Sequence, residues 1–205
     1  MLYSEIKRAT LGHINRYSIA GSPVAPSYNN QEDYVHRIPQ LINDALVNIR
    51  TLVKPDPAVV QLKHFKDYGD YLRCRLPDDF WSLKTGGVTV VRGGRFQSTN
   101  DYRLMGKDYI LVPKDSGSYT VEYYRYPNQL PLAPDDSYEL EEDLEVIQTA
   151  TYYAAANLAL HDDEFVYASL YNDYESRLGR ISRGLPRAEV QSVQDAYSFT
   201  DVGCC

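Results

Sequence analysis

The 205-residue sequence has only three cysteines, and their positions exclude a disulfide framework. Cys74 stands alone, and Cys204 and Cys205 are adjacent at the end of the sequence. This arrangement lacks the spaced pairs of a disulfide-rich secreted domain, and it cannot supply the four ligands of a structural zinc site. We therefore expect the chain to be made in a reducing cytoplasm, and we assign no role to Cys204 and Cys205.

Long apolar runs are also missing. No stretch approaches the ~20 apolar residues that cross a bilayer. The N-terminal stretch MLYSEIKRATLGHIN lacks the apolar segment and the small-residue cleavage site of a signal peptide. The sequence therefore predicts neither a membrane span nor a membrane partner.

Positive charge is in deficit, with 21 Lys and Arg against 28 Asp and Glu and a formal net charge of -7. This balance disfavours a protein that binds nucleic acid over a broad basic face. Tyrosine is abundant instead, with 19 copies against 5 Phe and 1 Trp. Because a tyrosine ring is apolar and its hydroxyl is polar, tyrosine suits half-buried strands and protein interfaces. The composition thus favours contacts with other proteins.

Hydrophobic spacing predicts helices at the N-terminal end. The first has Ile6, Ala9, Ile14 and Tyr17 at helical spacing, with Ser4 as a possible N-cap. The second has one apolar face made of Tyr34, Ile38, Leu41, Ile42, Ala45, Leu46, Ile49 and Leu52. Pro39 is expected to kink this helix or to mark a new first turn, and the stretch KPDP at 54–57 ends it.

Hydrophobic spacing predicts two more helices towards the C-terminal end. A proline-rich segment comes first, and acidic residues follow in the expected first turn of a helix. The apolar stripe of this helix consists of Leu144, Ile147, Ala150, Ala154 and Leu158. A further helix from about Glu164 to Arg180 carries Phe165, Ala168, Leu170, Tyr171, Tyr174 and Leu178, and Gly184 lies beyond it. The last twenty or so residues have no core pattern and are interpreted as an extended arm.

The middle of the sequence predicts about five to seven short strands. The stretches DYLRCRLP and TVEYYRYP alternate as half-buried strands do, and TGGVTVVRGGRF predicts a strand bracketed by glycine turns. Gly106 is expected in a hairpin, and KDSGSY supplies the next turn. The predicted class is α+β: a four-helix core from residues 1–53 and 135–183, an inserted small antiparallel β domain at 58–127, and an extended arm at 184–205.

Possible catalytic motifs have plainer explanations. His161 and Asp162 match the metal-binding dipeptide of metal-dependent phosphohydrolases, and His13, His36 and His64 are the other histidines. We instead expect the acidic stretch Asp162–Glu164 to cap the last helix. Gly93-Gly94 within RGGR suits a hairpin turn, and the GKD at 106–108 lacks the rest of a phosphate loop.

Two further stretches also fit a structural role. Alternation places Cys74 opposite Arg73 and Arg75, which indicates a buried structural thiol. The stretch DDFW at 78–81 is expected to be a loop whose Phe80 and Trp81 plug the edge of a small core, with a carbohydrate-binding surface as a weaker alternative. The sequence therefore predicts no catalytic, cofactor or metal residues, no cofactor and no enzyme.

Several stretches resemble the head-tail connector adaptors of tailed bacteriophages. They are EDYVHRIPQLINDALVNI at 32–49, RLPDDFWSLK at 75–84, residues 102–131, and, matching best, the alanine-rich helix, acidic turn and tyrosine-bearing helix at 144–178. The resemblance implies a structural virion protein that forms a twelvefold ring under the portal protein, carries the stopper or tail proteins below, and lines the DNA channel without binding DNA specifically. It implies assembly in the host cytoplasm and a final place in the neck of the virion.

In such proteins the C-terminal arm reaches the portal protein or a neighbouring subunit. The resemblance assigns that role here to residues from about Leu185 onward, with Leu185, Arg187, Val190, Tyr197 and Phe199 as candidate anchors. Two alternatives stay open: another phage neck or tail protein, such as a stopper or a tail-completion protein, and a metal-dependent phosphohydrolase using His161 and Asp162. The helical share of the sequence argues against a stopper, which is expected to be mainly β.

Overall fold

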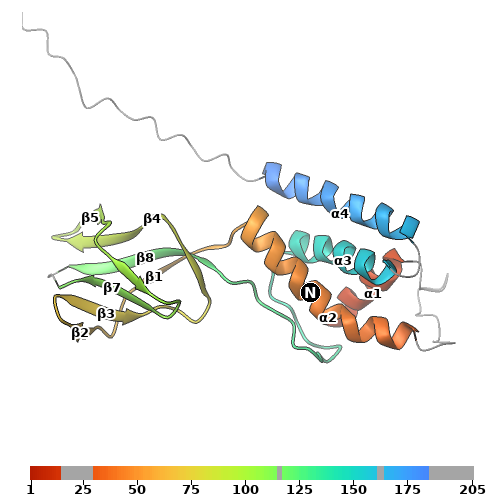
Figure 1. Ribbon diagram of the computed structural model, residues 1–205, viewed down its shortest axis with the longest axis horizontal. Helices are drawn as coiled ribbons and strands as arrows, with labels where there is room; N and C mark the ends of the chain where they lie inside the picture. Colours follow the sequence, from red (N-terminus) through yellow and green to blue (C-terminus); the bar gives the residue numbers. More distant parts are fainter. Residues whose placement is uncertain (15–29, 115–116, 161–163, 185–205) are drawn as a thin grey trace, which may run out of the picture.

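The computed structural model describes residues 1–14, 30–114, 117–160 and 164–184, and it places helices at both ends of the chain with strands between them (Figure 1). Helices α1 (Tyr3–His13) and α2 (Asn30–Asn48) and the short π-helical turn η1 (Ile49–Val53) precede the strands. Helices α3 (Leu144–Ala159) and α4 (Glu164–Gly184) follow them. The mixed helix-and-sheet class with an antiparallel β part agrees with the sequence-based prediction.

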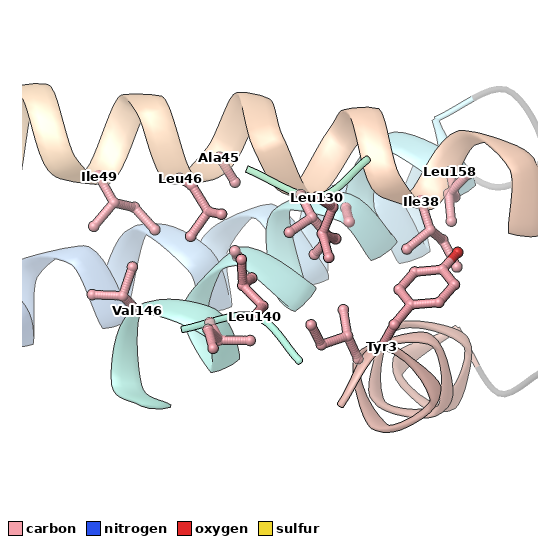
Figure 2. Close-up of a cluster of buried hydrophobic side chains, with 14 of the residues drawn as sticks. Tyr3, Ile38, Ala45, Leu46, Ile49, Leu130, Leu140, Val146 and Leu158 are labelled. Atoms are coloured by element: carbon pink, nitrogen blue, oxygen red, sulfur yellow. The ribbon is translucent and has the colours of Figure 1, made fainter. Parts of the chain in front are cut away.

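One cluster of buried side chains draws residues from all four helices. Figure 2 shows Ile38, Ala45, Leu46 and Ile49 along one side of α2 and η1, with Val146 of α3 near the Ile49 end and Tyr3 of α1 near the Ile38 end. The fully buried members from α3 also include Ile147, Ala150 and Ala154, which belong to the predicted stripe. A smaller cluster joins Ala155 and Ala156 of α3 to Leu170 of α4, and these small side chains let the two helices approach closely.

The segment between the last strand and α3 completes this cluster. Leu130 and Leu140 are 3% and 1% exposed and insert between the helices (Figure 2). The Asn43 side chain fixes Leu130 from α2, because it donates to the Leu130 carbonyl at 2.8 Å and accepts from the Leu130 amide at 2.7 Å. Two leucines of the proline-rich segment therefore belong to the core, whereas most residues between them are exposed.

Several helical predictions are wrong in detail. Ser4 is not the N-cap of α1, because Leu2 precedes the helix and its amide donates to the Glu5 carboxylate at 3.0 Å. Helix α2 continues through Pro39, so of the two expected roles this residue does not mark a new first turn. Leu52 is 79% exposed, because the backbone changes to π geometry after Asn48, with the Lys54 amide bonded to the Ile49 carbonyl, and the helical spacing no longer holds.

Two further apolar residues lie outside the core. Phe165 is 84% exposed, since it is five residues before the buried Leu170 and so about 140° away around the helix. Leu144 is 59% exposed in the first turn of α3. Ala168 is also exposed, so the apolar face of α4 is narrower than its sequence suggests.

Eight described strands form two antiparallel sheets, somewhat more strands than the sequence predicts. They are β1 (Pro57–Gln61), β2 (Lys66–Tyr68), β3 (Tyr71–Arg75), β4 (Phe80–Arg92), β5 (Arg95–Ser98), β6 (Arg103–Met105), β7 (Tyr109–Pro113) and β8 (Ser118–Arg125). The strand orders are β1-β8-β4-β5 and β2-β3-β7-β6. Both sheets contribute to a second core that includes Cys74, Val88, Ile110, Tyr119 and Val121, separate from the helical cluster.

Two of the predicted glycine turns are confirmed and one is wrong, while the turn predicted at KDSGSY includes residues 115–116, which lie outside the described residues. Gly93 and Gly94 turn β4 into β5 with φ of 54° and 77°, and Gly106, with φ of 64°, lies between β6 and β7. Gly86 and Gly87 form no turn; they lie within β4, where the pairing with β8 shifts register between Leu83 and Val88.

The stretch DDFW does not form the expected loop throughout, because its two aromatic residues begin β4. Phe80 packs against the β core as predicted. Trp81 instead lies 38% exposed, with its ring 5.2 Å from that of Tyr126.

Candidate functional site

Most of the predicted site residues lie outside the part of the chain that the structure describes. This holds for the proposed arm anchors Leu185, Arg187, Val190, Tyr197 and Phe199, and also for His161, Asp162, Cys204 and Cys205. Helix α4 begins at Glu164, the last residue of the acidic stretch that the sequence predicts as its cap; the preceding residues 161–163 lie outside the described part.

The histidines of the described part lie on separate elements. His13 ends α1, His36 is exposed on α2, and His64 lies between β1 and β2 with φ of 58°. Within residues 1–14, 30–114, 117–160 and 164–184, no group of three or more His, Cys, Asp or Glu side chains could hold a metal ion.

His13 belongs to a stack that joins three helices. Its ring lies 3.8 Å from the ring of Tyr152 on α3, and its Nε2 is 3.2 Å from the Thr151 hydroxyl. The Arg177 guanidinium of α4 also lies against Tyr152, 4.1 Å from the ring centre, and it donates a hydrogen bond to the Tyr152 hydroxyl at 3.0 Å. Burial and the nearby Arg177 lower the pKa of His13, against a smaller opposing effect of Asp173.

Cys74 is a buried thiol, as the sequence predicts. It is 2% exposed in β3, and its Sγ donates to the Lys63 carbonyl at 2.9 Å. Burial raises the pKa of the thiol, so it is held in the protonated form, which is a poor nucleophile.

A groove lined with tyrosines lies between α2, η1, α3 and α4. We call it the tyrosine groove; it has a volume of about 220 Å³ and is lined by Asn48, Leu52, Val53, Tyr153, Tyr171, Tyr174, Glu175 and Leu178. The rings of Tyr153 and Tyr174 are 5.2 Å apart, and those of Tyr171 and Tyr174 are 5.8 Å apart. The exposed Leu52 lines the same groove, so an apolar side chain faces solvent beside a row of aromatic rings.

The tyrosines of this groove are electrically neutral at physiological pH. Burial raises the pKa of Tyr153, Tyr171 and Tyr174, with a further contribution from Glu175 at the last two. Their hydroxyls therefore stay protonated and can donate hydrogen bonds. An apolar floor with a few hydroxyl groups and one carboxylate suits a protein side chain better than a charged ligand.

A second, polar cleft lies where the β part joins the helical part. It has a volume of about 460 Å³, and its lining includes Arg50, Asp56, Asp79, Arg125, Glu141 and Glu142. Most of these charges are already paired: Arg50 with Glu142, Arg125 with Asp56 at 2.7 Å, and Asp79 with the Tyr123 hydroxyl at 2.9 Å. We interpret this cleft as a structural joint.

Sequence reasoning missed the tyrosine groove, although it noted the excess of tyrosine and the helices that line it. It placed Leu52 in the core because helical spacing continues through it, and no local signal marks the π-helical turn. No protein-family model matches this chain, and no curated protein matches it. Among the described helices, none combines the length and apolar character needed to cross a bilayer.

Proposed function

We propose that this chain is a structural protein of a tailed bacteriophage, the head-to-tail adaptor that forms a ring under the portal protein. In this proposal helices α1, α2, α3 and α4 form the four-helix core of each protomer. The observation that carries it is the tyrosine groove with the exposed Leu52 at its side, a surface suited to another protein chain.

Two features of the chain support the proposal. The stretches that resemble the adaptor family include 32–49, which covers most of α2, and 144–178, which covers α3 and most of α4. The tyrosine groove lies between these same helices. In a closed ring each protomer meets two neighbours through different surfaces, so a groove on one side that receives apolar side chains from the next copy fits such an assembly.

The remaining parts of the proposal follow from the resemblance. The ring contacts the portal protein above and stopper or tail proteins below, and DNA passes through it without sequence-specific binding. The arm from about Leu185, with Arg187, Val190, Tyr197 and Phe199, makes contacts to the portal protein or a neighbour. The protein is not an enzyme, uses no cofactor, and has its final place in the virion neck.

The first test is the copy number of this protein relative to the portal protein in purified virions, measured by quantitative mass spectrometry. A ratio near one is expected, because an adaptor ring matches the portal subunit for subunit. A stopper or tail-completion protein would also be present, so electron microscopy of isolated necks is needed to place the ring next to the portal. Absence from the particle refutes every structural version of the proposal.

The tyrosine groove can be tested with Leu52→Asp. Because Leu52 is 79% exposed, the variant should fold with the thermal stability of the wild type. If the groove is a contact between copies, a carboxylate there should weaken self-association at least tenfold, as expected when an apolar anchor of an interface is lost. Sedimentation of the purified protein, alone and with the portal protein, measures this change.

Phe96→Asp is the matched control, because Phe96 is similarly exposed at 77% but lies on β5 in the β part. It should assemble like the wild type. Equal self-association of Leu52→Asp and the wild type would remove the tyrosine groove from the assembly contacts.

A further inference from the structure

The outer face of the sheet β2-β3-β7-β6 has a composition unlike the rest of the protein. Cross-strand pairing places Lys66 opposite Arg73, Arg73 opposite Leu111, and Leu111 opposite Arg103, so one row across four strands carries three cations. Residues directly opposite one another in antiparallel strands share a face. The row therefore presents Lys66, Arg73 and Arg103 together.

Tyrosines flank this row on the same face. The neighbouring rows pair Tyr68 with Tyr71 on one side and Arg75 with Tyr109 on the other. We call the set Lys66, Tyr68, Tyr71, Arg73, Arg103 and Tyr109 the basic face. The opposite side of the sheet contributes Cys74, Ile110 and Val112 to the β core, so alternation along the strands directs the basic face outward. In Figure 1 this sheet lies at the end of the molecule away from the helices.

The cations of the basic face lack carboxylate partners among the described residues. Elsewhere in the β part, Lys84 pairs with Glu122 at 3.0 Å, Lys114 with Asp67 at 2.6 Å, and Arg125 with Asp56 at 2.7 Å. Lys66, Arg73 and Arg103 form no ion pair with any described residue, and no Asp or Glu occupies the three rows. Three adjacent cations without counter-charges make a local site for an anion with several charges.

Two of the arginines lie over tyrosine rings. The Arg73 guanidinium is 4.9 Å from the Tyr109 ring centre, and that of Arg103 is 5.2 Å from the Tyr71 ring centre. Leu111 lies opposite both arginines on the outer face and is 6% exposed. Tyr68, on the edge strand β2, is 50% exposed and leaves its ring accessible. Guanidinium planes and aromatic rings are the surfaces on which unpaired bases stack.

The charge of the β part is opposite to that of the rest of the chain. Residues 58–127 contain 11 Lys and Arg against 8 Asp and Glu, whereas all other residues contain 10 against 20. The net charge of the whole chain therefore conceals a basic region. Four strands spaced about 4.8 Å apart give the basic face a width of about 14 Å, enough for a few nucleotides.

We propose that the basic face binds single-stranded nucleic acid without strong sequence preference. Phosphates lie against Lys66, Arg73 and Arg103, and a base stacks on Tyr68. The contact is independent of the ring that the proposed function describes.

An acidic segment of a second copy is the rival occupant, and the structure disfavours it. In the most acidic stretch, residues 135–145, five of the seven carboxylates already lie within 4.0 Å of a cation of the same chain; the shortest contacts join Asp136 to Lys7 at 2.6 Å, Glu142 to Arg50, and Asp143 to Lys54 at 3.0 Å. Binding these groups to another copy would require breaking existing pairs. Binding the phosphates of a nucleic acid would not require breaking any of these ion pairs.

The test is fluorescence anisotropy of a labelled oligothymidine about 12 nucleotides long, within the usual site sizes for such proteins. For the wild type, the logarithm of affinity should fall with the logarithm of salt concentration with a slope of about -2, because three phosphates are neutralised on a single strand. Lys66→Ala combined with Arg103→Ala should reduce the slope to about -0.7. Tyr68→Ala should weaken binding about tenfold with the slope unchanged.

The control is Lys84→Ala combined with Arg95→Ala, which removes the same charge from strands of the other sheet. It should bind the oligonucleotide like the wild type. Equal losses in both double variants would show a non-specific charge effect and overturn the proposal. Three further results would also overturn the proposal. The wild type could bind a duplex of the same length equally or more tightly, or it could fail to bind the oligonucleotide at low salt. The basic-face variants could lose self-association without losing oligonucleotide binding.

Discussion

Replacing Arg50 with alanine should destabilise the protein strongly, because it removes one partner of a buried ion pair. The Arg50 and Glu142 side chains are 6% and 5% exposed. Arg50 donates to the Glu142 carboxylate through Nε at 3.0 Å and through Nη2, and to the Lys54 carbonyl through Nη1 at 3.3 Å. Glu142 also accepts from the Asn128 amide at 3.2 Å, so this carboxylate joins η1 to the chain that returns from the β part.

The expected cost follows from what remains after the substitution. In Arg50→Ala the Glu142 carboxylate stays buried and keeps only the Asn128 amide as a donor. Leaving one charge of a buried pair without its partner typically costs about 3–5 kcal/mol. The total stability of a domain is about 5–15 kcal/mol, so a large part of it should be lost. Urea unfolding at pH 7, followed by circular dichroism of the helices, measures the free energy of unfolding.

Arg75→Ala is the matched control, because Arg75 pairs with Asp78 at 2.6 Å while both side chains are largely exposed. An exposed pair contributes about 0–1 kcal/mol, so this variant should unfold close to the wild type. Arg50→Met combined with Glu142→Leu should be more stable than Arg50→Ala, since no buried charge remains unpaired. A cost below about 1 kcal/mol for Arg50→Ala would refute the reasoning about burial.

Two further predictions concern the helical stack and the bulge of β4. The pKa of His13 is lowered in the folded state, so as the pH falls the unfolded chain binds a proton at His13 before the folded chain does. The stability that neutral His13 contributes should therefore be fully present above about pH 6.5 and be lost as the pH falls below it. The urea midpoints of the wild type at pH 7 and pH 5.5 should differ, and in His13→Gln they should converge; an unchanged difference in His13→Gln contradicts this. Gly87→Ala should cost about 1–3 kcal/mol, because its Cβ would overlap the Glu122 carbonyl and lie 2.6 Å from the Lys84 carbonyl oxygen. Gly94→Asn, where φ is 77° and no atom lies within 4 Å of the added Cβ, should cost less in the same unfolding assay.

Local sequence signals predicted the elements that depend on neighbouring residues. Helical spacing gave α2 and α3, alternation gave the burial of Cys74, and the glycines at 93, 94 and 106 gave their turns. The same signals failed at Leu52, Phe165 and Gly86. Leu52 is exposed because the backbone changes to π geometry after Asn48, and Phe165 because it lies about 140° around α4 from the buried Leu170. The backbone around Gly86 depends on its register with β8.

The candidate surfaces were even less accessible to sequence reasoning. The tyrosine groove combines residues near 50, 153 and 174, which only packing of the helices brings together. The basic face combines residues 66, 73 and 103 from strands that are distant along the chain. The net charge of -7 disfavours nucleic-acid binding over a broad basic face, but it could not reveal the local basic face, because a sum over the chain contains no information about how charges are distributed on the surface.

The sequence by itself determined the α+β class, the order of helices and strands, and the identity of most core residues. These properties follow from periodicity, since a helix or strand can bury only the residues that its own geometry directs to one side. The tertiary structure decided which apolar residues remain exposed beside the tyrosine groove and which cations share a face without carboxylates. Both depend on pairing between distant segments, where register and packing determine the neighbours of each side chain.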